Sequence, residues 1–360
     1  MSEWIHIPPD GAGTGVGRAR PPRKIGLETW WTRHVATGRA IEVAENGDLS
    51  AAQSTSLYAM RGMAICIVVI AHATRWPIHS LYWCIPLFFF LPGYLFRQPE
   101  DVGAYVGLIA RKLLVPYFIF MGVIAAPALY QIYLHQGTEA MLARIGVLLM
   151  GGERITGVWA AFWFPTCFLF THVLYTLCMR RFSALTVSLL CIPMLGLATL
   201  NDHFADFWLP LGLNIVPFAF PLMHAGWLYR HRQFSREMDH WFHVTIISIG
   251  LAYTFIVLVG LAPPLQVKIA KYGWPVITVV SAVFTVIALK RVFDKLVDKR
   301  LVSLVFGQLG KASMIIMFVH QPIQLMILNV AGLENEPVRI VLTLTGSYLF
   351  YRLFKALRWV

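Results

Sequence analysis

The sequence predicts an all-α, polytopic membrane protein with about ten transmembrane helices. Of the 360 residues, 58% are hydrophobic and only 13% are charged, and the mean hydropathy is +0.64, which lies outside the usual range of soluble globular domains. The apolar runs are continuous rather than alternating, so helices rather than barrel strands are expected to satisfy the backbone in lipid. A bilayer core about 30 Å thick needs roughly 20 apolar residues per helical span. Such segments are predicted near residues 57–76, 80–97, 113–134, 159–179, 182–200, 207–229, 240–262, 272–289, 311–330 and 338–357.

Two stretches outside these segments differ from the rest of the chain. Residues 1–56 are polar and rich in Gly and Pro, with a tryptophan pair at Trp30 and Trp31, and we expect a disordered cytoplasmic tail with an interfacial anchor at that pair. Residues 57–360 are expected to form one membrane unit. The connection 135–158 contains MLARIGVLLM, which is too short to cross a bilayer and is expected to form a re-entrant or surface-lying helix.

The distribution of basic residues predicts the orientation. With a cytoplasmic N-terminus, 23 of the 30 Lys and Arg residues fall on the inner side and six on the outer side, as the positive-inside rule requires. Both termini are therefore predicted to be cytoplasmic, in a multi-pass protein of the cell inner membrane. The net charge of +12 then needs no nucleic acid partner, because a basic inner face attracts anionic lipid headgroups or a polyanionic cytoplasmic substrate.

The five cysteines all lie within apolar segments. They are Cys66, Cys84, Cys167, Cys178 and Cys191, and no two form a C-x-x-C pair. We interpret them as free core thiols, neither disulfides nor ligands of a metal.

The first predicted span carries a strong cation and an imidazole in the stretch RGMAICIVVIAH. Eleven helical steps from Arg61 to His72 make about 20° more than three full turns, so both lie on one face about 16.5 Å apart. Taken singly, Arg61 can be a snorkelling arginine and His72 a hydrogen-bonded core histidine. Together they favour a polar path leading from the inner surface, with arginine to bind phosphate and histidine to exchange a proton.

Four motifs in order give the chain a family resemblance. LYAMRGMAICIVVIAH followed by PLFFFLPGYLF, then YVGLIARKLLVPY, PLMHAGWLYRHR and LGKASMIIMFVHQPI resemble the integral-membrane acyltransferase 3 family. That family moves acyl groups, most often acetyl from acetyl-CoA, onto sugars of cell-surface polysaccharides. The resemblance covers much of the chain, and the spacing of arginine, ten residues and histidine is its most specific part.

The resemblance implies roles for particular residues. His72 would be the catalytic base or transient acyl carrier, and Arg61 would steady the donor. Arg111 would contact the CoA phosphates, with Lys112 as a helper at the same surface, although ordinary positive-inside flanking explains both equally well. His320 matches a motif histidine, with Ser313 two turns before it on nearly the same face, and the pair is expected to line the cavity opposite His72 unless His320 is a structural core histidine.

Candidate acceptor contacts come from the aromatic residues. The stretch WAAFWFP at 159–165 opens the fourth predicted span from the outer side, and its Trp163 is a candidate for contacting the acceptor sugar. Asn214, Ser313 or Trp163 could donate a hydrogen bond to the reacting thioester oxygen, and no motif singles out one of the three. The alternative is an interfacial aromatic belt.

The chain departs from the family pattern at several positions. Tyr58 stands where the family often has an acidic residue, Pro92 where a serine is common, and Met317 and Phe318 replace the usual tyrosine. Any carboxylate that steers Arg61 must therefore come from elsewhere or be missing.

The sequence as a whole favours a membrane O-acyltransferase. The expected donor is cytoplasmic acetyl-CoA or another acyl-CoA, without a metal, and the expected acceptor is a sugar hydroxyl of a cell-surface polysaccharide or its lipid-linked precursor; membrane lipids complete the partners. The alternative is a transporter or flippase of a glycan or small polar solute, since intramembrane Arg and His also mark ion-coupled carriers. No Asp or Glu for ion coupling is expected inside the membrane, which argues against a carrier. A scaffold protein would leave Arg61 and His72 without a purpose.

Overall fold

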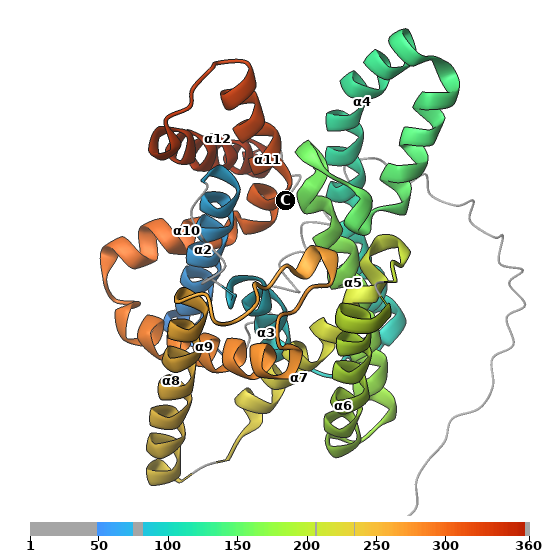
Figure 1. The fold of residues 1–360 in the computed structure, drawn as a ribbon. Coiled ribbons are helices and arrows are strands. Elements are labelled where there is room, and N and C mark those ends of the chain that lie inside the picture. The colour runs from blue at the N-terminus through green and yellow to red at the C-terminus, as the bar shows by residue number, and fades with distance from the viewer. Residues whose placement is uncertain (1–48, 75–81, 206, 234, 357–360) are drawn as a thin grey trace, which may run out of the picture. The chain divides into compact units, whose positions relative to one another are not determined.

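The computed structural model describes residues 49–74, 82–205, 207–233 and 235–356. Within these ranges every regular element is helical (Figure 1), and each of the ten predicted segments contains a helix. Residues 1–48 of the predicted cytoplasmic tail, which include Trp30 and Trp31, lie outside the described residues, whereas residues 51–56 belong to the first helix. The main helices are α2 (Ala51–Ala73), α3 (Cys84–Leu95), α4 (Val102–Met150), α5 (Trp163–Arg181), α6 (Ala184–Leu200), α7 (Val216–His231), α8 (Arg236–Leu258), α9 (Pro275–Leu296), α10 (Gly307–Lys311), α11 (Ser313–Asn329) and α12 (Glu336–Ala356).

Seven helices in the described part of the chain are long and apolar enough to cross a membrane, or eight if a bent pair counts as one span. That pair joins Val302–Lys311 to Ser313–Asn329 at an angle of 78°. Helix α3 has only 12 residues. Helix α12 has 21 residues but is not among the helices that are apolar enough to cross a membrane. The protein is therefore a multi-pass membrane protein with at least seven candidate spans, where the sequence predicted about ten.

Helix α2 begins six residues before the predicted start. Ser50 accepts a hydrogen bond from the Gln53 amide at 3.2 Å, and the Gln53 side chain accepts one from the Ser50 amide at 3.0 Å. This reciprocal arrangement is a capping box, which satisfies amides that the first helical turn leaves without partners. The helix runs 23 residues to Ala73, so one element carries both Arg61 and His72.

Helix α4 corrects the expected form of the outer connection. The element spans 49 residues and turns back at Gly137, whose φ of 85° is readily adopted by glycine. The arm from Val102 to the turn is about 50 Å long at 1.5 Å per residue, well beyond the roughly 30 Å of a bilayer core. The stretch MLARIGVLLM is thus the returning arm of a helical hairpin, visible at the upper right of Figure 1.

Two close helix crossings organise the part of the fold around the candidate site. A Cβ added to Gly62 would overlap the Phe306 carbonyl, and one added to Gly310 would overlap the Tyr58 carbonyl, so α2 and α10 meet backbone to backbone. Helices α3 and α7 meet in the same way: a Cβ on Gly93 would overlap the Met223 carbonyl, and one on Gly226 the Phe90 carbonyl. Small residues allow such approach between membrane helices.

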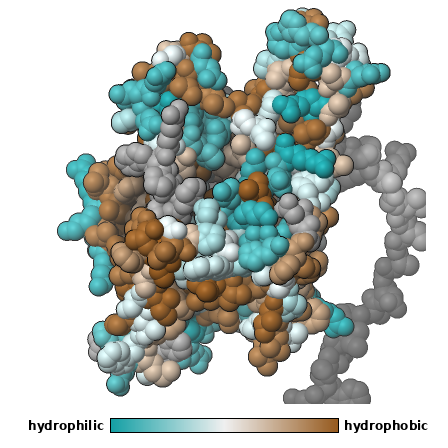
Figure 2. Space-filling view, in the orientation of Figure 1, coloured by the Kyte–Doolittle hydropathy of each residue, from teal (hydrophilic) through white to brown (hydrophobic). Residues whose placement is uncertain are grey.

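The surface agrees with a lipid environment. Large apolar side chains are exposed along α6 and α8, among them Leu185, Ile192, Leu251 and Phe255 at 65–70%, a pattern that a water-facing surface rarely shows. In Figure 2, hydrophobic residues form a band across the lower part of the view, and hydrophilic residues gather near its centre and over the tip of the α4 hairpin. These helices therefore present their apolar faces outward.

Candidate active site

Arg61 lies one residue before the α2–α10 crossing, half-buried. Its guanidinium donates to the Ser313 hydroxyl at 3.3 Å and lies 5.9 Å from the centre of the Tyr58 ring. The Lys311 ammonium lies 5.5 Å from the same ring centre. The tyrosine at the family's acidic position therefore offers two cations an aromatic face, and no carboxylate in the described part of the chain pairs with Arg61.

Helices α2 and α11 run parallel and in register along this face. Arg61 bonds to Ser313, and the Gln324 amide donates to the His72 carbonyl, with the same sequence separation of 252 in both pairs. An equal separation at both contacts means that the two helices point in the same direction. Polar residues of α11 therefore face both the Arg61 end and the His72 end of the stripe predicted on α2.

His72 and His320 meet at the far end of this pair of helices. Their ring centres lie 5.3 Å apart with the planes tilted by 39°. The His72 side chain is exposed, whereas His320 is fully buried at 0%. The structure therefore places His320 beside His72, and His72 is the more exposed of the two rings.

The hydrogen bonds of His320 determine its protonation pattern. Its Nδ1 lies 2.8 Å from the Ile316 carbonyl, which can only accept, so Nδ1 carries a hydrogen. In the neutral ring Nε2 then has a lone pair, and this atom is buried without a hydrogen-bond partner among the described residues. A buried acceptor of this kind is costly, and the neighbouring His72 ring carries groups that can satisfy it.

Side chains from α11 and α12 hold the backbone at the end of α2. The Gln324 amide donates to the His72 carbonyl, and the Arg339 guanidinium donates to the Ala73 carbonyl. Thr74 also donates its hydroxyl to the Ile70 carbonyl at 3.0 Å. Terminal helix carbonyls need such partners, and meeting that need here orients the turn that carries His72.

A lysine from the segment between α8 and α9 also belongs to this end. The Lys268 ammonium donates to the Ile155 carbonyl at 2.5 Å and lies close enough for its charge to act on the His72 ring. Burial lowers the pKa of Lys268, and the negative charge of Glu153 partly opposes this shift. Lys268 thus adds a positive charge to the His72 end of the site.

The stretch between the two ends of the stripe is apolar. Ile65 and Val68 lie on the face shared by Arg61 and His72, and both pack in a hydrophobic cluster with Ile316 of α11. The sequence predicted a polar path along this face. The polar groups instead gather at its two ends, because each intervening helical turn places an aliphatic residue there.

The remaining predicted residues lie apart from this pair of histidines. Arg111 and Lys112 are exposed on the first arm of α4, about 13 Å along the axis before Phe120, which stacks on Phe318 of α11. Trp163 is 6% exposed in the hydrophobic cluster that includes α3 and α7. Its neighbour Phe162, rather than Trp163, packs against α11.

Sequence reasoning missed three residues that shape the site, namely Gln324, Lys268 and Arg339. A signal was present for Gln324, because Ser313, His320 and Gln324 fall within about 20° of one helix face. Lys268 and Arg339 had no such signal, since both stand in or beside loops and were counted only as outer charges. Their positions depend on how distant segments pack.

Comparison with known proteins agrees with this geometry. The family described as "Acyltransferase domain", the acyltransferase 3 family, matches residues 55–352, which is most of the chain. No curated protein and no solved structure shows a match. The matched region contains α2 from Thr55 onward and all of α11, and therefore both histidines and Arg61. Together with the apolar helices, the match shows that the chain belongs to the acyltransferase 3 family of membrane acyltransferases.

Proposed function

We propose that this protein is a membrane O-acyltransferase that transfers acetyl from cytoplasmic acetyl-CoA, or another acyl group from its CoA ester, to a sugar hydroxyl. The acceptor is a cell-surface polysaccharide or its lipid-linked precursor. The observation that carries the proposal is the exposed His72 ring beside the buried His320, on one helix face with Arg61, in a chain of the acyltransferase 3 family.

His72 can perform the transfer by either of two routes. As a general base, its free nitrogen takes the proton of the sugar hydroxyl while the hydroxyl oxygen attacks the thioester carbonyl. The C–S bond then breaks, and the leaving CoA thiolate receives a proton. As a nucleophile, the nitrogen itself attacks the carbonyl, the thiolate leaves, and the acyl-imidazole passes its acyl group to the sugar.

His320 is proposed to act as a positioning residue for His72. The Nδ1 hydrogen of His320 is committed to the Ile316 carbonyl, so its Nε2 can only accept in the neutral ring. An N–H of His72 turned toward this acceptor leaves the other His72 nitrogen with a lone pair directed away from it. Both routes require that lone pair.

The charged groups suit the two ends of the donor. Arg61 lies about 16.5 Å from His72 along α2 and can bind a phosphate or carboxylate group. The half-buried Val68 side chain between them suits the hydrocarbon parts of a pantetheine arm. Near His72, the Lys268 ammonium can balance the negative charge that develops on the thioester oxygen.

The decisive experiment measures acyl transfer in membranes. Vesicles from producing cells, which contain the native acceptor, receive radiolabelled acetyl-CoA, and label in the glycan fraction is counted and located by mass spectrometry. We expect His72→Ala to lower the rate by about 10²–10⁴-fold, the usual contribution of a positioned base. His135→Ala is the matched control, because His135 is an exposed histidine on α4 whose ring lies 3.2 Å from the Gln131 side chain one turn away.

Two results would contradict the proposal. Label transfer at the wild-type rate in His72→Ala would remove the histidine from the reaction. Movement of a solute across the vesicle membrane without any need for acyl-CoA would instead support a transporter.

A further inference from the structure

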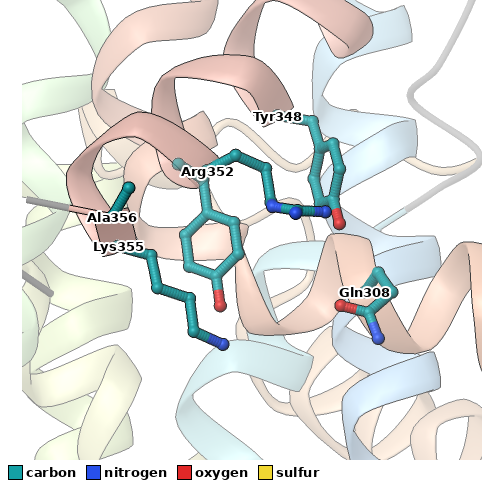
Figure 3. Close-up of a pocket in the computed structure, with 6 residues that line it drawn as sticks. Gln308, Tyr348, Arg352, Lys355 and Ala356 are labelled. Atoms are coloured by element: carbon teal, nitrogen blue, oxygen red, sulfur yellow. The ribbon is translucent and has the colours of Figure 1, made fainter.

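A cavity of about 270 Å³ lies between α10 and α12. Its lining residues are Gln308, Tyr348, Tyr351, Arg352, Lys355 and Ala356. Figure 3 shows the Arg352, Lys355 and Gln308 side chains around one space, with the Arg352 guanidinium directed toward Tyr348. The lining thus contains two cations, two phenol rings and a carboxamide, but no carboxylate.

The cavity lies at the Arg61 end of α2. Gln308 stands two residues before Gly310, which touches the Tyr58 backbone. At the opposite end, Arg339 near the start of α12 donates to the Ala73 carbonyl. Helix α12 therefore contacts the His72 end of α2 near its own start, and its last turns line the cavity beside α10.

Positive charge accumulates around this end of α2. The Arg61 guanidinium and the Lys311 ammonium lie 5.9 Å and 5.5 Å from the centre of the Tyr58 ring. Lys355 lies 6.0 Å from the centre of the Tyr351 ring. The Asp294 carboxylate lies near the start of α2. It accepts from Ser56 at 2.7 Å and pairs with Lys290 at 2.7 Å, so its charge is already balanced.

We propose that this cavity binds the phosphate-bearing nucleotide end of the acyl donor, with Arg352 and Lys355 holding phosphate groups and Tyr348 and Tyr351 contacting the planar base. Arginine and lysine bind phosphate by charge-assisted hydrogen bonds, and aromatic rings stack on bases. The inference rests on the proposed function, because it takes an acyl-CoA as the donor. It assigns the nucleotide to α10 and α12, whereas the family resemblance implies Arg111, to which the sequence adds Lys112 as a helper.

The same chemistry can also bind an anionic phospholipid headgroup, since basic residues at a membrane surface attract such lipids. A nucleotide and a lipid differ in the planar base, which only the nucleotide offers to the two tyrosines. The geometry favours the nucleotide because the cations and rings line a partly open hollow of about 270 Å³ rather than a flat patch.

The test measures binding to the purified full-length protein in detergent. Adenosine 3′,5′-bisphosphate, which lacks the acyl group and the pantetheine arm, is titrated calorimetrically into the wild type and into Arg352→Gln/Lys355→Gln. We expect the double variant to weaken binding by tenfold or more, as the loss of charged hydrogen bonds implies. Arg180→Gln/Arg181→Gln, which removes two exposed cations at the end of α5, should bind like the wild type.

Several results would overturn the assignment. Unchanged affinity for the bisphosphate in the Arg352→Gln/Lys355→Gln variant would overturn it. A loss of affinity confined to Arg111→Gln/Lys112→Gln would place the nucleotide site on α4 instead. Displacement of the bisphosphate by micelles of phosphatidylglycerol at a similar phosphate concentration would identify a lipid site.

Acyl transfer separates this inference from the proposed function. In membranes, the double variant should raise the KM for acetyl-CoA with little change in kcat, because binding rather than chemistry is affected. An unchanged KM together with a His72-dependent reaction would leave the acyltransferase standing and remove the cavity assignment. Nucleotide binding that depends on Arg352 and Lys355, in a protein that shows no acyl transfer, would support the cavity assignment and contradict the acyltransferase proposal.

Discussion

At the scale of single residues, Tyr58 explains how Arg61 is held without a carboxylate. Its ring lies within 6 Å of both the Arg61 guanidinium and the Lys311 ammonium, and each such contact is worth roughly 0.5–2 kcal/mol. An aromatic face attracts a cation without neutralising it. Arg61 therefore keeps its positive charge available for an anionic donor group.

His320 provides the residue-scale prediction. His320→Phe keeps a planar ring but removes the Nε2 lone pair, so we expect kcat to fall by about 10²-fold with the KM for acetyl-CoA unchanged. His320→Gln, which can again present an acceptor, should recover part of the rate. Steady-state kinetics on both variants checks this, and a kcat for His320→Phe within twofold of wild type would show that His320 has only a packing role.

At the scale of elements, the site depends on two neighbours of α2. Helix α11 runs beside it in parallel and supplies Ser313 at one end and His320 with Gln324 at the other. Helix α10 crosses it at Gly62 and Gly310 with the backbones in direct contact. Because α10 is joined to α11 through Ala312 alone, this crossing also sets where α11 begins.

The crossing predicts a sharp difference between two glycine substitutions. Gly62→Ala places a methyl group against the Phe306 carbonyl and should destabilise the protein by about 1–3 kcal/mol or more. Gly122→Ala on α4 has no neighbour within 4 Å and should be neutral or slightly stabilising, because alanine favours helix. Thermal unfolding in detergent measures both, and equal Tm values would mean that α2 and α10 can separate without cost.

At the scale of the whole molecule, the two ends of the site are predicted to face opposite sides of the membrane. The basic residues predict that the Arg61 end faces the cytoplasm and the His72 end faces outward. A donor held at the inner end can then present its acyl group to an acceptor reached from the outer end. The two substrates need not enter from the same side.

Labelling of single introduced cysteines tests that orientation. Cysteines at Arg181 and Lys299 should react only from the cytoplasmic side with a membrane-impermeant maleimide, and cysteines at Leu261 and Glu334 only from outside. All four positions are exposed, whereas the five native cysteines are free thiols that are buried or half-buried. Labelling of Leu261→Cys and Arg181→Cys from the same side would reject the predicted topology.

The sequence by itself determined the helical class, the positions of the helices and the shared face of Arg61 and His72. These follow from apolar composition and from the 3.6-residue repeat, which act within one segment. Only the tertiary structure decided that the α4 connection is a hairpin and that the stripe is apolar between its ends. It also decided that Gln324, Arg339 and Lys268 surround the end of α2. Those contacts join residues more than a hundred positions apart, and no local periodicity encodes which distant segments pack together.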